Sequence, residues 1–471
     1  MKKLSTPHDK LKLGIWLYLI LLIFEGSLRK WFLPSLATPL LVIRDPIAIG
    51  VLIYGSYIGL ITWNRYMIAF FAIGLLGLGA AMSLGHQNLP TAVYGARIFL
   101  FHVPFVFAIG KVFEREDVEQ AGRFLLYCSI LAAFLTFLQF YSPQSAWVNR
   151  GVGGDISGSG FSGAAGYLRP AGLFSFTNGN ALFFSLAACF VIYFWFSDNL
   201  VKKSLLILAT LSIFLAIPVS LSRGLVFQLA LTLMATLFVI VRKPKFLNKL
   251  LVAGAAAIVT LAVLSFIPAF QTAMEVLSLR FMQASVSEGG LEGTLGDRFF
   301  GGLFSALANS TNHGIAGQGI GLGTNVGATF VSGGRGFLVA EEEWARNIGE
   351  LGAIMGLMVV GMRISMSLTY AWRSYVNLSR GDILPWILNS FVFLNLMQGG
   401  WAQPTSLGFC IVAVGLLLAS LKKPMSARST DTKAASARSD RNHGRRLRKH
   451  HRREPDRHVE APVTSPPPTP S

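Results

Sequence analysis

Residues 204–241 read SLLILATLSIFLAIPVSLSRGLVFQLALTLMATLFVIV, and this stretch decides the class of fold. It holds one charged residue, Arg223, between two apolar runs, each about as long as a membrane-spanning helix. Similar runs recur along the chain, in which 52% of residues are hydrophobic and 14% are charged. Soluble domains average about 25% charged residues, and membrane β-barrels alternate polar and apolar residues. The sequence therefore predicts an all-α polytopic membrane protein.

The apolar runs predict about twelve transmembrane helices within one membrane domain, residues 1–421. Two long loops, 142–178 and 271–343, interrupt the runs, and the second lies between the predicted ninth and tenth helices. The approximate limits of the predicted helices are 11–28, 41–62, 67–84, 92–110, 124–141, 179–197, 204–220, 224–241, 250–270, 344–364, 383–398 and 404–421.

The distribution of basic residues predicts the orientation. Placing both termini in the cytoplasm puts 30 of the 41 Lys and Arg on the cytoplasmic side, Arg363 included, in agreement with the positive-inside rule. Residues 422–471 hold 13 Lys and Arg against 5 acidic residues and have few apolar ones. We interpret them as a disordered cytoplasmic tail beside anionic lipid, although a basic run can also bind nucleic acid.

Arginine dominates the basic residues on the predicted outer side. Lys30 is the one lysine there, and the planar guanidinium of arginine suits carboxylate and phosphate. An anion site on that side is one interpretation. The other is that each arginine pairs with a nearby acid, such as Glu25 with Arg29 and Arg44 with Asp45. The outer arginines are Arg29, Arg44, Arg97, Arg150, Arg169, Arg223, Arg280, Arg298, Arg335 and Arg346.

Two outer motifs suggest where an anion would bind. Arg169 begins RPAGLF, which leads through NGN, with Asn180, into the predicted sixth span, and a helix entrance with free N–H groups favours an anion. Arg223 lies in SLSRG, next to hydrocarbon, where a charge is costly and functional by default. The alternatives are a capped loop at the first motif and a snorkelling arginine at the second. His102, within a span, is interpreted as a hydrogen-bonded core residue.

Two further motifs lie before and at the start of the predicted tenth span. GQGIGLGTN at residues 317–325 lacks the strand and helix that a dinucleotide fingerprint needs, so a flexible turn is favoured. EEEWARNIGELG at residues 341–352 places Glu343, Arg346 and Glu350 on one helix face. Glu350 lies inside the apolar region and must face protein or water. These acids are either general-base candidates or members of internal ion pairs.

Taken together, the loop before the tenth span, RPAGLF with NGNA, SLSRG, GxGxG and E-x-E-W-x-R-x-x-x-E-x-G resemble the O-antigen ligase and polymerase (Wzy/WaaL-like) family over about residues 10–421. EGSLRKWFLP at 25–34 and IRDP at 43–46 resemble a subgroup associated with exopolysaccharide polymerisation. The resemblance implies a GT-C-like helical fold in the bacterial inner membrane, with the 271–343 loop in the periplasm.

The resemblance also implies an activity. Members transfer a glycan from undecaprenyl pyrophosphate to an acceptor at the periplasmic face, without metal, nucleotide or other cofactor, in an inverting reaction. Arginines hold the pyrophosphate, and here these map onto Arg169, Arg223 and Arg298. Ligase members carry a His before the tenth span. That position falls on Glu341, which favours a polymerase with Glu341 or Glu343 as proton acceptor, supported by Arg346, Glu350 and Asn180.

The expected partners are the lipid-linked donor and acceptor, membrane lipid and other polysaccharide assembly proteins, with no nucleic acid. The main alternative is a secondary transporter or a flippase for lipid-linked glycans, which twelve spans would also suit. A third is a non-catalytic scaffold of an export complex that docks through the basic tail.

Overall fold

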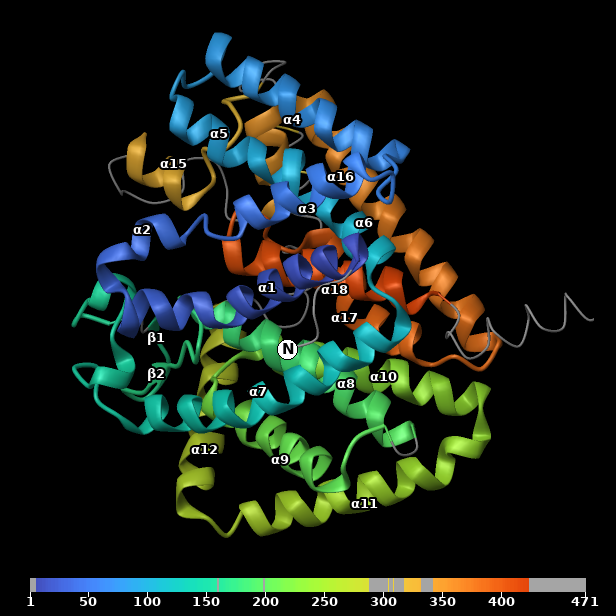
Figure 1. The fold of residues 1–471 in the computed structure, drawn as a ribbon. Coiled ribbons are helices and arrows are strands. Elements are labelled where there is room, and N and C mark those ends of the chain that lie inside the picture. Colours follow the sequence, from blue (N-terminus) through green and yellow to red (C-terminus); the bar gives the residue numbers. More distant parts are fainter. Residues whose placement is uncertain are drawn as a thin grey trace, which may run out of the picture. The chain divides into compact units, whose positions relative to one another are not determined.

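The computed structural model describes residues 6–158, 161–197, 200–287, 304, 308, 317–331 and 342–422, and helices dominate this part of the chain (Figure 1). The α-helices are α1 (Pro7–Ser27), α2 (Ala37–Leu40), α3 (Asp45–Tyr57), α4 (Arg65–Ser83), α5 (Leu89–Arg97), α6 (Val103–Val112), α7 (Arg115–Tyr141), α8 (Thr177–Phe196), α9 (Lys203–Val219), α10 (Arg223–Arg242), α11 (Leu247–Leu264), α12 (Pro268–Ser287), α15 (Asn325–Phe330), α16 (Glu343–Ser379), α17 (Leu384–Gln398) and α18 (Pro404–Ser420).

Short irregular elements join these helices. A single antiparallel pair of two-residue strands, with Phe161 opposite Arg169, gives the loop at 142–178 a hairpin. The short elements are the π-helices η1 (Leu28–Phe32) and η3 (Ile98–His102), the 3₁₀ helices η2 (Pro34–Leu36), η4 (Trp147–Asn149), η5 (Val152–Gly154) and η6 (Pro244–Phe246), and the strands β1 (Phe161–Ser162) and β2 (Leu168–Arg169).

The helices have the length and composition of membrane spans. Within the described residues, nine helical segments are long and apolar enough to cross a membrane. This confirms the prediction of a helical membrane protein. The predicted spans 204–220, 383–398 and 404–421 correspond to α9, α17 and α18, which have 17, 15 and 17 residues. At 1.5 Å per residue these are about 22–26 Å long, shorter than the roughly 30 Å hydrocarbon layer.

The core is built around α8 and α18. Their sequences are apolar on all sides, and a helix of this kind is buried among others rather than lying at a surface. α8 contacts α7, α9, α10, α17 and α18, and nearly all of α18 is buried. By contrast, most of the described side chains of α11 are exposed, as expected of a helix that faces lipid.

A second, smaller apolar cluster lies under the β1–β2 hairpin. It joins the end of α7, the hairpin, the turn between α9 and α10, and α12. This arrangement corrects the sequence analysis, in which residues 271–343 form a loop, because α12 continues helical structure to Ser287. Its apolar residues Ala273, Val276 and Leu277 have the spacing of one helix face and pack into this cluster.

Candidate functional site

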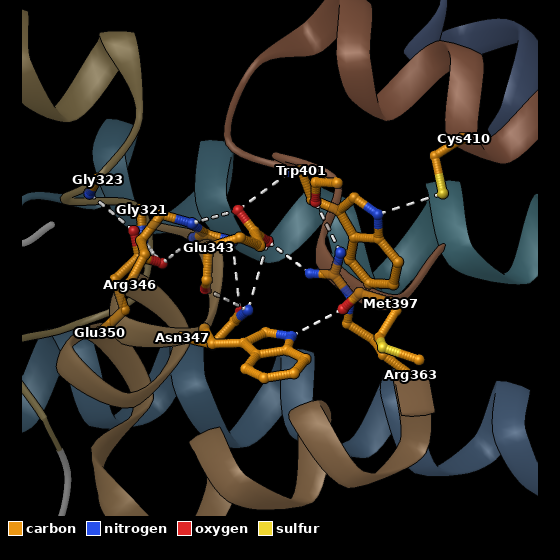
Figure 2. A network of polar contacts seen from close by, with 12 residues as sticks. Gly321, Gly323, Glu343, Arg346, Asn347, Glu350, Arg363, Met397, Trp401 and Cys410 are labelled. Atoms are coloured by element: carbon orange, nitrogen blue, oxygen red, sulfur yellow. Dashed lines mark hydrogen bonds and ion pairs between the residues drawn. The ribbon is translucent and has the colours of Figure 1, made fainter. Parts of the chain in front are cut away.

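The predicted motif at 341–352 forms a buried ionic network, shown in Figure 2. Arg346 donates to both carboxylate oxygens of Glu343, at 2.7 Å from Nη2 to Oε1 and 3.1 Å from Nε to Oε2. Arg363 Nη1 lies 2.8 Å from Oε1, and the backbone N–H of Trp401 lies 3.1 Å from Oε2. Both oxygens of Glu343 are therefore occupied, and a role as proton acceptor would require one of these bonds to open.

Glu350 extends this network to the glycine-rich loop. Its Oε1 accepts from the N–H of Gly323 at 2.7 Å, and its Oε2 accepts from Gly321 N at 3.1 Å and Arg346 Nη1 at 2.6 Å. Glu350 is 1% exposed. The prediction that Glu350 faces protein or water is confirmed, with protein as its surroundings, and so is the shared helix face of Glu343, Arg346 and Glu350. We call Glu343, Arg346, Asn347, Glu350, Arg363 and Trp401 the Glu343 network.

A break at Gly352 explains how Arg363 reaches Glu343. Gly352 has φ 77° and ψ 170°, so α16 consists of two helices. In an unbroken helix the two charged residues would lie about 30 Å apart. Instead the segment 343–351 folds back along the helix that follows, and a Cβ on Gly356 would lie 2.6 Å from Ile348 Cα. The single span predicted at 344–364 is therefore wrong, because the apolar run is divided at Gly352.

The glycine-rich loop closes the broken end of the first helix. Gln318 N donates to the Gly349 carbonyl at 2.8 Å, and Gly319 N donates to the Glu350 carbonyl at 3.0 Å. These carbonyls lose their helical partners at the break. The predicted turn is present, but α16 holds it in place. Gly321 has φ 96°, and a Cβ there would lie 2.1 Å from the Thr91 carbonyl oxygen, so the loop requires glycine.

Arg363 holds the end of α17 as well as Glu343. It donates to the carbonyls of Leu396 at 2.8 Å and Gly399 at 2.6 Å, and its guanidinium lies 3.9 Å from the centre of the Trp401 ring. The side chain is fully buried. The sequence analysis counts Arg363 among the cytoplasmic basic residues, but the structure places it inside the protein, paired with Glu343.

The charges of Arg280 and Arg223 act on a third arginine, Arg169, and we call these three residues the arginine triad. Arg169 lies on β2, Arg223 is the first residue of α10, and Arg280 on α12 donates to the Gly163 carbonyl at 3.1 Å. Burial, followed by the charges of Arg280 and Arg223, lowers the pKa of Arg169 to about 10. Within the described residues, Arg169 has no acidic partner, and its Nε forms no hydrogen bond.

The local backbone places one of these arginines, Arg223, at the start of α10. Leu221, in the turn between α9 and α10, has φ 48°, an uncommon value for a residue with a branched side chain. Its side chain is fully buried in the smaller apolar cluster, and Ser222 Oγ caps α10 by accepting from Leu225 N at 3.2 Å. This turn presents Arg223 at the helix start. Sequence reasoning selects Arg169 and Arg223 but not Arg280, which it assigns to a loop.

Among the described residues, the predicted site residue Asn180 does not join the triad. Asn180 is fully buried, and its Nδ2 donates to Thr136 Oγ1 at 3.2 Å. Arg298 and Glu341 lie outside the described residues.

Sequence reasoning also misses a buried ionic group between α1, α3 and η3. Glu25 pairs with Arg29 at 3.4 Å, as expected, but Arg44 pairs with Glu25 at 2.9 Å and not with Asp45. Consecutive side chains on a helix point in different directions, which separates Arg44 from Asp45. Asp45 instead accepts from Arg97 at 2.8 Å and pairs with His102 at 2.9 Å. His102 is thus the hydrogen-bonded core residue that the sequence predicts.

Candidate metal ligands do not gather in the part of the chain that the structure describes: no group of three or more His, Cys, Asp and Glu side chains there could hold an ion. The charged groups of the described residues are the Glu343 network, the arginine triad and the group around Glu25 and Asp45. Comparison with protein-family models and with curated proteins gives no match.

Proposed function

We propose that the chain is a membrane glycosyltransferase that polymerises or ligates oligosaccharide repeats carried on undecaprenyl pyrophosphate. In this proposal it has a GT-C-like fold of about twelve spans, and the site faces the periplasm. The observation that carries the proposal is the arginine triad. Arg169 is partly buried and has no acidic partner among the described residues, and an anionic ligand beside it would favour its charged form.

The triad suits the diphosphate of a lipid-linked sugar. Departure of a polyprenyl diphosphate leaves negative charge on the phosphate oxygens, and guanidinium groups arranged beforehand stabilise that charge in the transition state. The three arginines come from the hairpin, α10 and α12, so they can contact the anion from different directions. Arg298, the third arginine that the resemblance implies, remains a candidate fourth contact.

The transfer step is a substitution at the anomeric carbon. The acceptor hydroxyl oxygen forms a bond to this carbon from the side opposite the diphosphate, which inverts its configuration. The bond between the carbon and the diphosphate oxygen breaks, and the polyprenyl diphosphate leaves with the electron pair. The hydroxyl proton passes to a carboxylate, for which we propose Glu341, because both oxygens of Glu343 already accept hydrogen bonds.

The direct test is turnover of a lipid-linked oligosaccharide by the purified full-length protein, read as a ladder of products. We expect Arg223→Gln to reduce turnover by about a hundredfold or more, the usual effect of removing one transition-state donor. Arg242→Gln is the matched control, because Arg242 ends the same helix and contacts the rings of Phe238 and Tyr375. Wild-type turnover in Arg223→Gln would refute the role of the triad in diphosphate binding. Absence of product with the wild-type protein would refute the proposed glycosyltransferase activity.

A second candidate function is transport of a lipid-linked glycan. Broken helices and buried ionisable groups are features of transporters, and this chain has both, at Gly352 and around Glu25 and Asp45. Protein in liposomes distinguishes the two. Movement of labelled lipid-linked oligosaccharide between leaflets, without a change in its length, would favour transport.

A further inference from the structure

A small cavity lies where the N-termini of α8 and α18 meet Arg29. Its lining includes Arg29, Ser175, Asn178, Gln403 and Thr405, and it has room for about one water-sized group. The residues before the two helices, Phe176 and Gln403, provide no side-chain cap. α18 begins at Pro404, which has no N–H, and Gly179 N already donates to the Phe176 carbonyl at 3.1 Å. The lining residues with N–H groups that have no partner inside a helix are therefore Asn178 and Thr405.

Arg29 supplies a hydrogen-bond donor that the protein does not use. Its Nε donates to the Ala37 carbonyl at 2.8 Å, and its Nη1 contacts Ser175 Oγ at 3.2 Å and Glu25 at 3.4 Å. The side chain is 10% exposed, yet Nη2 forms no hydrogen bond with any described residue. Arg29 Nη2 is not itself buried, so it is open to the cavity, where an acceptor can reach it.

The charges around Arg29 are also unbalanced. Glu25 is shared between Arg29 and Arg44, and the closer contact is with Arg44 at 2.9 Å. The nearby Asp45 is already engaged by Arg97 and His102. One carboxylate therefore balances two guanidinium groups, which leaves one positive charge in excess next to two positive helix ends. In a medium of low dielectric constant this excess attracts an anion.

We propose that the Arg29 cavity binds one small monovalent anionic group, either a free halide or the carboxylate of an acidic sugar. The size of the cavity favours one water-sized atom or one carboxylate oxygen over a phosphate. Binding of a sugar carboxylate rests on the proposed function, because the carboxylate would belong to the glycan being transferred. Asn178 and Gln403 are exposed and lie where such a group would enter.

The test is thermal unfolding of the purified full-length protein in the presence of anions. Sodium bromide and sodium glucuronate are each titrated into a sodium methanesulfonate background at constant ionic strength, with methyl glucoside as an uncharged control. A ligand that binds only the folded state raises the midpoint of unfolding in proportion to RT ln(1 + [L]/Kd). We expect a saturable rise with at least one of the two anions and none with methyl glucoside.

The result with each anion identifies the source. A rise with glucuronate alone supports a sugar carboxylate, a rise with bromide alone supports a free halide, and a rise with both supports the shared chemistry. In Arg29→Gln the rise should disappear, whereas Arg65→Gln, an exposed arginine on α4, should keep it. No rise in the wild type, or an equal rise in Arg29→Gln, would overturn the proposal.

A second variant covers the case in which Arg29→Gln does not fold. Asn178→Leu removes an amide from the cavity entrance while leaving the pair between Glu25 and Arg29 in place, so a reduced anion response is expected. Its midpoint without anion should be lower than that of the wild type, because Asn178 Nδ2 also donates to Ser406 Oγ at 2.7 Å, and the anion response is measured from that midpoint. An unchanged response in this variant would count against the cavity. None of these measurements uses glycosyl transfer, so failure of the anion site and failure of the proposed enzyme are separate results.

Discussion

The Glu343 network and the arginine triad differ in how their charges are balanced. In the network, two carboxylates face two guanidinium groups, and Glu343, Arg346 and Glu350 bond to one another and to backbone groups. In the triad, the charges near Arg169 are those of other arginines. Breaking a balanced buried pair leaves a buried charge without its partner, which is costly. Arg346 and Arg363 are fully buried and paired, whereas Arg169 is only partly buried and has no acidic partner among the described residues.

The largest effect should follow from unbalancing the network. Glu343→Ala leaves Arg346 and Arg363 buried with one carboxylate fewer, and removal of one partner from a buried pair costs about 3–5 kcal/mol. We expect a matching loss of unfolding free energy in detergent. Glu342→Gln, one residue earlier and only partly buried, should change it by less than about 0.5 kcal/mol. Equal stability of Glu343→Ala and wild type would show that the network does not hold the folded-back segment.

A smaller loss should follow from disturbing the loop that Glu350 binds. Gly321→Ala forces an L residue to φ 96° with its Cβ against the Thr91 carbonyl, and strain of this kind costs about 1–3 kcal/mol. Gly361→Ala is the control, because a Cβ there meets no atom within 4 Å. Thermal unfolding of both variants measures the difference. If the two glycines tolerated alanine equally, the loop would not be fixed as described.

Substitution in the triad should not lower the unfolding free energy, in contrast to substitution in the Glu343 network. Arg169→Gln removes a charge that other arginines repel, so we expect no loss of stability and a small gain. The same variant should lose affinity for inorganic pyrophosphate, measured by calorimetry without added metal. If Arg169→Gln lost stability and bound pyrophosphate unchanged, Arg169 would have a structural role, as Arg346 and Arg363 do. The proposed difference between the two regions would then be wrong.

The smallest effect concerns pH. Because the pKa of Arg169 is lowered to about 10, part of its charge is lost in the empty protein above that pH, whereas an anion favours the charged form. Pyrophosphate affinity should therefore fall by about fourfold from pH 8 to pH 10.5. Arg169→Gln should lack this step, and a wild-type profile parallel to that of the variant would contradict the assignment.

The positions of most helices could be predicted from hydropathy alone. The run at 179–197 became α8, Thr177–Phe196, and the run at 224–241 became α10, because a continuous apolar stretch of this length has few alternatives in a membrane. The shared face of Glu343, Arg346 and Glu350 followed from helical spacing. Arg169 and Arg223 stood out because charge beside apolar sequence is costly.

The remaining features depend on contacts between distant segments. Hydropathy continues across Gly352, so nothing in the apolar run marks the break. That break depends on a loop more than thirty residues earlier, whose N–H groups donate to the freed carbonyls. The role of Arg280 could not be predicted, because α12 is only mildly apolar and does not have the composition of a membrane span. The Arg29 cavity depends on two helix starts more than two hundred residues apart.

The fold-back at Gly352 also bears on how the chain enters the membrane. Arg363 lies in the middle of an apolar helix, and insertion of a lone arginine there costs about 2.5–3.5 kcal/mol. Its counter-ion, Glu343, precedes it in the chain and is therefore synthesised first. By the time the ribosome has extended the helix to Arg363, Glu343, Arg346 and Glu350 have already been synthesised, so the two acids and two arginines can enter the bilayer as a neutral group.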